Sequence, residues 1–119
     1  MTLIQIVTAH QAIDALSDRD MNGQLAYRMA KFLSKTRTDY DFYSSEARKL
    51  YDKYGEKQSD DTLLIPAERV SEFNSALETL NGTNAEDPNI RFPLSEISSE
   101  LKLSMRQIYP LLDFVDEDN

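Results

Sequence analysis

The sequence predicts a mainly α-helical protein, an elongated helical bundle around one long helix of about residues 22–54, with a small two-stranded β-ribbon. Three observations lead to this fold class. No proline occurs from Asn22 to Tyr54, and the only glycine there is Gly23, at the start. Apolar residues recur in that stretch every three or four positions, which is the spacing of one helical face. Two short apolar runs elsewhere each end at a proline, which is typical of short strands.

The long helix carries one continuous stripe of apolar and aromatic residues with a period close to 3.6. A straight helix of this length measures about 50 Å, whereas a compact globule of this chain length is roughly 35 Å across. The helix must therefore protrude, bend or meet a second copy. Two shorter helices laid end to end beside it would also resolve the mismatch without a dimer. The stripe consists of Leu25, Met29, Phe32, Thr36, Tyr40, Tyr43, Ala47, Leu50 and Tyr54.

Four tyrosines fall close together in "YDFYSSEARKLYDKYG", residues 40–55. They could line a binding site or form a packing seam. An eleven-residue step turns a helix by three turns and about 20°, so Tyr40 lies nearly above Tyr51. Three of the four tyrosines belong to the apolar stripe. We therefore interpret the repeat as a packing seam.

The two shorter helices are predicted over residues 3–17 and about 66–80. In the first, apolar side chains and alanines recur at helical spacing, and Thr2 is placed to cap the start. In the second, Val70, Phe73, Leu77 and Leu80 step by three and four before "NG" ends the helix.

The predicted ribbon comes from the two apolar runs that end at proline. Thr62–Ile65 precedes Pro66, and "IRF" precedes Pro93. We expect these two pieces to pair with each other and to rest on the helices, since an isolated two-stranded ribbon is only marginally stable.

The C-terminal part predicts two short helical pieces. One runs from about Leu94 to Leu101, and the other begins at Ser104, where "SMRQ" matches a capping box. An apolar face on the second piece is formed by Ile108, Leu111 and Leu112. We expect one domain, residues 1–119, in which residues 113–119 are a frayed acidic tail.

Composition narrows the functional classes. The chain has 119 residues, a net charge of −8 and no cysteine, which excludes disulfides, zinc–thiolate sites and thiol catalysis. Residues 1–37 carry five basic and three acidic groups, whereas residues 38–119 carry eight basic and eighteen acidic groups. This imbalance disfavours direct binding to nucleic acid, which needs a basic footprint. No apolar run approaches the ~20 residues that cross a bilayer, so we expect no membrane association.

No reaction centre can be assigned from the residues. His10 is the only histidine, and no acid or nucleophile is fixed beside it by spacing, so a packed helix residue is favoured over a general base. The three glycines sit at element ends and form no phosphate loop. The acid pairs in the loops lack EF-hand spacing. We expect no catalytic residues, no cofactor and no metal, hence no enzyme.

Two surface features could bind a partner. A basic stripe on the long helix follows from the helical spacing of Arg28, Lys31 and Lys35. Its alternatives are a solvated face or internal pairing with the acidic second half, including the tail. The tail acids form the second feature, and two aromatic residues lie off the apolar stripe. The candidate residues are Tyr27, Arg28, Lys31, Lys35, Phe42, Asp113, Asp116, Glu117 and Asp118.

Most of the chain resembles a family of small phage and prophage proteins of unknown function, helical and with a long central helix. The residues that carry the resemblance are "AIDALS", "LAYRMAKFLSKTRTDYDFYSSEARKLYDKYGE", "IPAERVSEFNSALETL" and "IRFPLSEI". The resemblance implies a phage-encoded accessory protein in the cytoplasm of a bacterial host. It carries over no functional residues. The N-terminus is more apolar, and the C-terminus more acidic, than the family pattern.

These observations favour a non-enzymatic accessory protein that acts through protein–protein interaction, with a partner whose identity the sequence does not specify. One alternative is an acidic inhibitor that imitates nucleic acid and blocks a host defence enzyme, because carboxylates can stand where phosphates would lie. A second alternative is a virion or tail assembly component that forms a homo-oligomer through the long helix.

Overall fold

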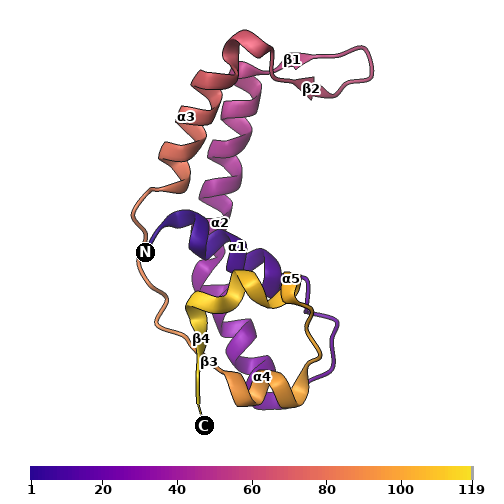
Figure 1. Ribbon diagram of the computed structural model, residues 1–119, viewed down its shortest axis with the longest axis vertical. Helices are drawn as coiled ribbons and strands as arrows, with labels where there is room; N and C mark the ends of the chain where they lie inside the picture. The colour runs from indigo at the N-terminus through magenta and orange to yellow at the C-terminus, as the bar shows by residue number, and fades with distance from the viewer. Residues whose placement is uncertain (119) are drawn as a thin grey trace.

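Helices dominate the computed structural model, which describes residues 1–118 (Figure 1). The molecule is elongated, 51 × 31 × 23 Å, with a radius of gyration of 17.1 Å. A compact chain of this length has a radius of gyration near 13–14 Å. The extra length comes from one helix, α2 (Gly23–Tyr54), which runs through both halves of the molecule. The prediction of an elongated bundle around a helix of residues 22–54 is confirmed.

The ends of α2 are set by local chemistry. At its start, the side chain of Asn22 accepts a hydrogen bond from the backbone N–H of Leu25 at 2.8 Å, which satisfies one of the free donors of the first turn. At its end, the N–H of Gly55 still reaches the carbonyl of Tyr51, but Gly55 itself is extended. A Cβ at Gly55 would stand 2.5 Å from that carbonyl oxygen, so only glycine lets the chain leave the helix here.

The lower half of the molecule, which we call the body, holds the hydrophobic core. It consists of α1 (Leu3–Asp14), the first half of α2, and residues 85–118 with α4 (Leu94–Glu100), α5 (Met105–Ile108) and the 3₁₀ helix η2 (Tyr109–Phe114). The fully buried ring of Phe32 lies at its centre. The core residues are Ile6, Ala9, Ile13, Leu16, Leu25, Met29, Phe32, Ile90, Phe92, Ile97, Leu101, Leu111 and Phe114.

The upper half, which we call the arm, spans residues 37–82. It pairs the second half of α2 with α3 (Val70–Asn81), which follows a short 3₁₀ turn, η1 (Ala67–Arg69). Throughout residues 37–82, all of them described, Phe73 is the only buried side chain. Tyr51 and Tyr54 pack on its ring, with centroids 4.9 and 6.2 Å away. The tyrosine repeat therefore belongs to the seam of the arm, as predicted.

The two shorter helices lie one after the other along α2, as expected. The start of α1 meets the chain just after α3, where the N–H of Leu3 donates to the carbonyl of Thr83 at 2.8 Å. The same junction pairs Thr2 with Asn84 in an isolated antiparallel bridge. α3 thus accompanies the arm part of α2, and α1 accompanies its body part.

A two-stranded antiparallel ribbon is present, but the predicted pairing within it was wrong. β2 (Leu63–Leu64) pairs with β1 (Glu56–Lys57), directly after α2, and the two form a hairpin at the end of the arm. The second predicted strand, β3 (Phe92–Pro93), lies in the body and pairs in parallel with β4 (Val115–Asp116). α3 separates the two predicted strands, so each finds a nearer partner.

The prediction of a frayed tail is corrected over residues 113–118. Phe114 is fully buried, and its ring meets that of Phe32 edge to face at 4.9 Å. β4 then pairs with β3, and the carboxylate of Asp118 accepts hydrogen bonds from the N–H and the hydroxyl of Ser95 at the start of α4. The buried ring of Phe114, whose neighbours in the sequence are largely acidic, therefore anchors residues 113–118. Asn119 lies outside the described residues.

Candidate partner-binding surfaces

The structure brings part of the predicted basic stripe together with one predicted aromatic residue. Tyr27, Arg28 and Lys31 line a shallow concavity of about 370 Å³. A third cation, Arg91, reaches it from the segment that follows Asn89. Tyr27 is 69% exposed. A ring beside several cations can contact an acidic surface, so we call Tyr27, Arg28, Lys31 and Arg91 the basic concavity.

Two cations of the basic concavity already have carboxylate partners. Arg28 pairs with Glu96 of α4 at 3.2 Å. Arg91 pairs with Asp87 at 2.6 Å, and its hydrogen bonds lower the pKa of that carboxyl group to about 2. The Arg28–Glu96 pair ties α4 to α2, the Arg91–Asp87 pair lies within residues 87–91, and both reduce the charge that a partner would meet. The internal pairing considered for the stripe therefore occurs at Arg28, with α4 in place of the tail.

The remaining predicted residues are scattered. Lys35 donates to the backbone carbonyl of Pro88 at 3.3 Å and lines the adjoining hollow. Phe42 is 48% exposed but lies farther along α2, outside the basic concavity. The tail acids split between several contacts. Asp113 accepts a hydrogen bond from Gln5 at 3.1 Å. Asp87 has the largest effect in raising the pKa of Arg91, and the charges of Asp116 and Asp113 raise it further. Asp118 binds Ser95, and Glu117 is exposed.

An exposed apolar stripe on α5 and η2 was not predicted. The side chains of Met105, Tyr109 and Leu112 are 83%, 73% and 54% exposed. They step by four and then three residues, which places them on one face of the helix. We call these three residues the α5 stripe. Leu112 was predicted to share one apolar face with Ile108 and Leu111, but it points outward.

A groove runs beside the α5 stripe, between α5 and α1. One hollow of about 340 Å³ lies among Thr8, Gln11 and Ala12 of α1 and the side chains of Arg106 and Pro110. A second, of about 680 Å³, lies around Met105 and Tyr109 and shares Arg106 and Pro110 with the first. Small side chains on α1 leave this space open. The stripe is therefore continuous with a shallow groove that has one cation in its wall.

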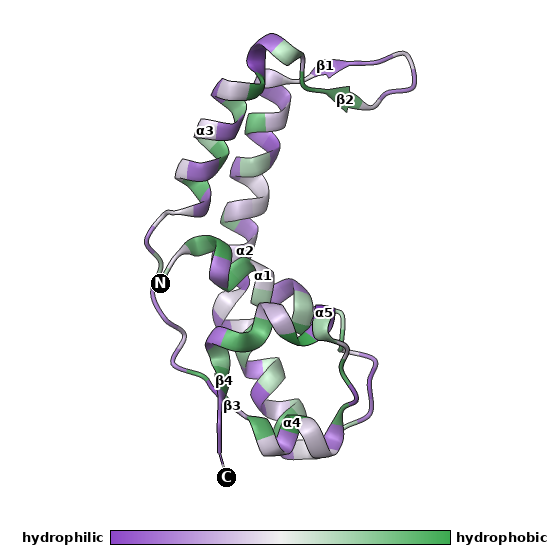
Figure 2. Ribbon diagram, in the orientation of Figure 1, coloured by the Kyte–Doolittle hydropathy of each residue, from purple (hydrophilic) through white to green (hydrophobic). Residues whose placement is uncertain are grey.

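The end of the arm exposes a further apolar group. Leu63 and Leu64 are 43% and 60% exposed, and Val70 at the start of α3 is 39% exposed. Leu63 lies against the end of α2, since a Cβ at Gly55 would be 3.3 Å from its Cβ. Successive strand residues face opposite sides, so Leu64 turns away from α2. We call Leu63, Leu64 and Val70 the arm tip, and Figure 2 shows its strand, β2, in green at the end of the arm.

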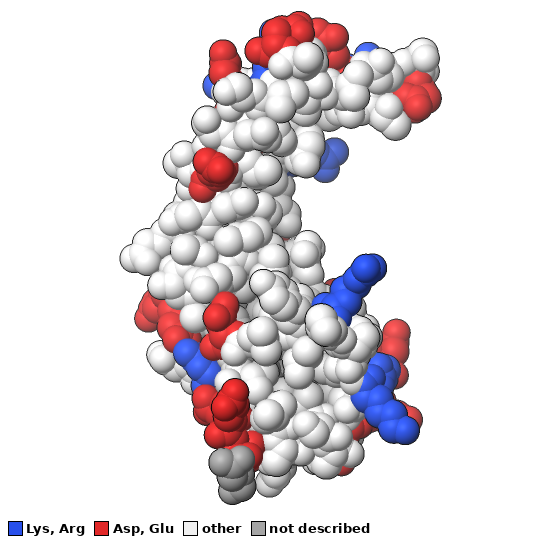
Figure 3. Space-filling model, in the orientation of Figure 1, with Lys and Arg blue, Asp and Glu red and all other residues white. Residues whose placement is uncertain are grey.

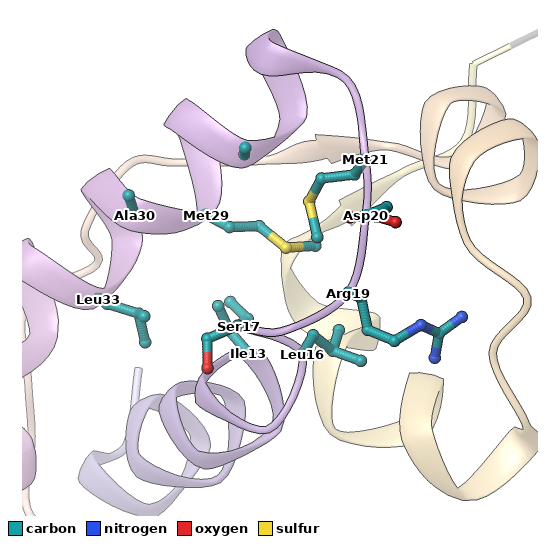
Figure 4. Close-up of a pocket in the computed structure, with 10 residues that line it drawn as sticks. Ile13, Leu16, Ser17, Arg19, Asp20, Met21, Met29, Ala30 and Leu33 are labelled. Atoms are coloured by element: carbon teal, nitrogen blue, oxygen red, sulfur yellow. The ribbon is translucent and has the colours of Figure 1, made fainter.

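The most enclosed hollow lies in the body, between the end of α1 and the start of α2. It holds about 260 Å³, somewhat below the ~300–1,000 Å³ of ordinary ligand pockets. Figure 4 shows the side chains of Met21 and Met29 meeting in it, while the guanidinium of Arg19 points away. Flexible methionines fill irregular gaps well. We interpret the hollow as a packing gap beside the 17–21 turn.

His10 is a packed residue, as favoured from the sequence. It is 1% exposed and stacks on Tyr40 with ring centroids 4.4 Å apart. The hydroxyl of Thr36 donates its one hydrogen to the carbonyl of Phe32, so it accepts a hydrogen bond from Nδ1 of His10 at 2.7 Å. Burial lowers the pKa of His10. His10 therefore joins α1 to α2 at the boundary between body and arm.

Neither a metal-binding cluster nor a membrane-spanning helix is found within residues 1–118. Within this range no group of three or more histidine or acidic side chains is placed to hold a metal ion. No helix in the same range combines the length and apolar character needed to cross a bilayer. In comparisons with known proteins, the chain matches no family model, no curated protein and no solved structure.

Proposed function

We propose that this protein is a non-enzymatic accessory protein, of phage or prophage origin, that acts by binding other proteins through the arm tip and the α5 stripe. The observation that carries the proposal is that large apolar side chains are uncovered at two separate places on one chain. Grouped exposed apolar side chains are typical of protein interaction sites. The proposed phage origin rests on the resemblance of the sequence alone.

The shape of the molecule supports this function. The arm buries little of its own surface and carries the hairpin about as far from the body as α2 reaches (Figure 1). An extension of this kind adds contact surface without adding core. Exposed aromatic and methionine side chains such as Tyr109 and Met105 are the types enriched in the centres of protein interfaces.

The nucleic-acid mimic has less support. Several carboxylates that could stand in for phosphates are engaged within the chain. Asp87 pairs with Arg91, Glu96 with Arg28 and Asp61 with Lys57. The assembly component has a specific observation in its favour, because the arm tip and the α5 stripe have opposite local charge.

The proposed function is tested by affinity capture from a bacterial host lysate followed by mass spectrometry. The wild-type bait is compared with Leu64→Lys at the arm tip and Tyr109→Glu on the α5 stripe. We expect captured proteins that are lost with these variants and kept with Ser98→Lys, a control at an exposed position of α4. Capture that is identical for all four baits, together with turnover of a small molecule, would contradict the proposal.

A further inference from the structure

We propose that the arm tip of one copy docks on the α5 stripe of a second copy, and that reciprocal docking closes a dimer. The inference rests on the proposed function, because it names a partner for the same two surfaces. It differs from an oligomer formed along the long helix, since the seam of α2 is occupied by α1 and α3.

The helix formed by α5 and η2 carries apolar side chains on two sides. Its inward side chains Leu111 and Phe114 are fully buried, yet Met105, Tyr109 and Leu112 on its other side are among the most exposed large apolar groups of the chain. Grouped exposed apolar side chains on a helix whose other side is already buried are typical of a surface that a partner covers. The α5 stripe therefore has the character of a covered surface.

The charge around the α5 stripe indicates what kind of surface would cover it. From Leu101 to Leu112 the chain carries Lys102 and Arg106 and no carboxylate. α1, the other wall of the groove, has a single carboxylate, Asp14, at its last residue. In a protein of net charge −8, this is a locally basic and apolar face. A partner that fits it combines apolar side chains with carboxylates, because complementary charge fixes register and raises the association rate.

The arm tip combines exposed apolar side chains with nearby carboxylates, as such a partner would. Leu64 and Val70 are exposed, and residues 56–70 carry four carboxylates against two cations. One of those cations, Lys57, is already paired with Asp61 at 3.2 Å. Figure 3 shows carboxylates gathered near the end of the arm. The arm tip is therefore apolar with a negative surround, and the α5 stripe is apolar with a positive one.

The positions of the arm tip and the α5 stripe favour docking between two copies. The hairpin and α5 project toward the same side of the molecule, and that side is hollowed and lined largely by uncharged groups (Figures 1 and 3). Within one chain, α2 is a continuous helix of 32 residues and holds the two surfaces apart. The arm tip can thus reach an α5 stripe only on another copy. When two copies enter each other's hollow, each arm tip meets the other's stripe and a twofold axis closes the pair.

The test measures the mass of the purified protein by sedimentation equilibrium over a range of concentrations. We expect a concentration-dependent dimer. Leu64→Lys and Tyr109→Glu should each weaken dimerisation by at least about tenfold, because a charge replaces an apolar side chain in a desolvated contact. The matched controls are Phe42→Lys and Tyr27→Glu, at side chains that are 48% and 69% exposed outside both surfaces, and these should dimerise like the wild type.

A mixing experiment then identifies the contact. Leu64→Lys and Tyr109→Glu should each be monomeric alone, but an equimolar mixture should form a heterodimer, because one unaltered arm tip meets one unaltered α5 stripe. Neither a tip-to-tip nor a stripe-to-stripe contact would be restored in this way. Met105→Glu, at a side chain that is 83% exposed, repeats the test if Tyr109→Glu does not fold.

Three results would overturn the proposal. The first is a wild-type monomer at concentrations up to about 1 mM, a very weak affinity for a specific complex. The second is a dimer that is insensitive to both variants, and the third is a mixture that stays monomeric. A monomer that captures another protein through Tyr109 would also refute self-docking, yet it would leave the proposed function standing. The two proposals can therefore fail separately.

Discussion

The body and the arm share one helix but are stabilised very differently. In the body, α2 is packed on several sides, and its buried residues Leu25, Met29 and Phe32 belong to a core that draws on both ends of the chain. In the arm, the same helix packs mainly on α3, and Phe73 is the single buried side chain among residues 37–82. The comparison teaches that one uninterrupted helix can be a core element in one half and an exposed strut in the other. Regions that bury few apolar contacts open at lower free energy.

The largest expected effect is on the body. Phe32→Ala removes the ring that meets Phe92 at 5.8 Å and Phe114 at 4.9 Å. We expect the free energy of unfolding to fall by about 3–5 kcal/mol, which is typical of a buried Phe→Ala change. Urea denaturation followed by circular dichroism measures it. Phe42→Ala, at a half-exposed ring of the same helix, serves as the control and should change stability far less. Equal losses in the free energy of unfolding for the two variants would mean that the buried core of the body adds no more stability than a half-exposed ring of the arm.

A smaller and more local effect is expected in the arm. Phe73→Ala removes the ring that Tyr51 and Tyr54 contact, and it should destabilise α3 by about 3 kcal/mol, the lower end for a buried Phe→Ala change. Hydrogen exchange should show faster exchange of α3 amides while protection of α1 and α4 is kept. If exchange rises equally in α1, body and arm unfold as one unit and the comparison fails.

One hydrogen bond closes the lower part of the arm. The hydroxyl of Tyr43 donates to the side-chain oxygen of Asn81 at 2.7 Å. Tyr43→Phe keeps the ring and removes this bond, so we expect a loss of about 1 kcal/mol. The same measurement on Asn81→Ala, and on the double variant, forms a cycle in which the pair should show coupling. Additive losses would show that the two residues act independently.

The smallest expected effect is a pH dependence at the boundary between the halves. Burial, and then the charge of Arg37, lowers the pKa of His10, while Asp14 and Asp41 oppose the change. Tyr40 covers the ring. The unfolded chain therefore binds a proton more readily than the folded one. The stability that neutral His10 contributes is complete above about pH 6.5 and is lost as the pH falls below that value.

The measurement is the Tm at about pH 7.5 and about pH 5.5, on either side of the ordinary histidine pKa. The fall in Tm on acidification should be greater for the wild type than for His10→Gln, whose side chain does not titrate. An equal fall in both proteins would assign the pH dependence to carboxylates elsewhere.

Helices were predictable because their signals are local. The absence of proline and the apolar period define α2 within one residue of its observed start. The "SMRQ" capping box forms as predicted. The hydroxyl of Ser104 accepts from the N–H of Gln107 at 3.2 Å, and the side-chain oxygen of Gln107 accepts from the N–H of Ser104 at 2.9 Å. Near Pro110 the chain changes from α to 3₁₀ geometry, which tolerates proline near its start.

Pairings and orientations were less predictable. The two short apolar runs that gave Leu63–Leu64 and Phe92–Pro93 carry no signal of which partner each strand has. Residues 105–114 are apolar on two sides, so periodicity could not tell that Leu111 faces the core and Leu112 faces outward. Acidic composition masked the anchoring ring of Phe114. Of the predicted partner residues, Tyr27, Arg28 and Lys31 do share one surface, whereas Phe42 and the tail acids lie elsewhere.

The way the body is assembled has a consequence for how the protein is made. Its core joins residues 6–32 to residues 90–114, while the arm is a hairpin formed by the chain in between. During synthesis the arm can pair as soon as α3 leaves the ribosome, because its contacts are close in sequence. α1 must wait, with Ile6 and Ile13 uncovered, until Leu111 and Phe114 have emerged. A ribosome stalled before Leu111 would therefore display a folded arm above an unfinished body, a form that chaperones should recognise.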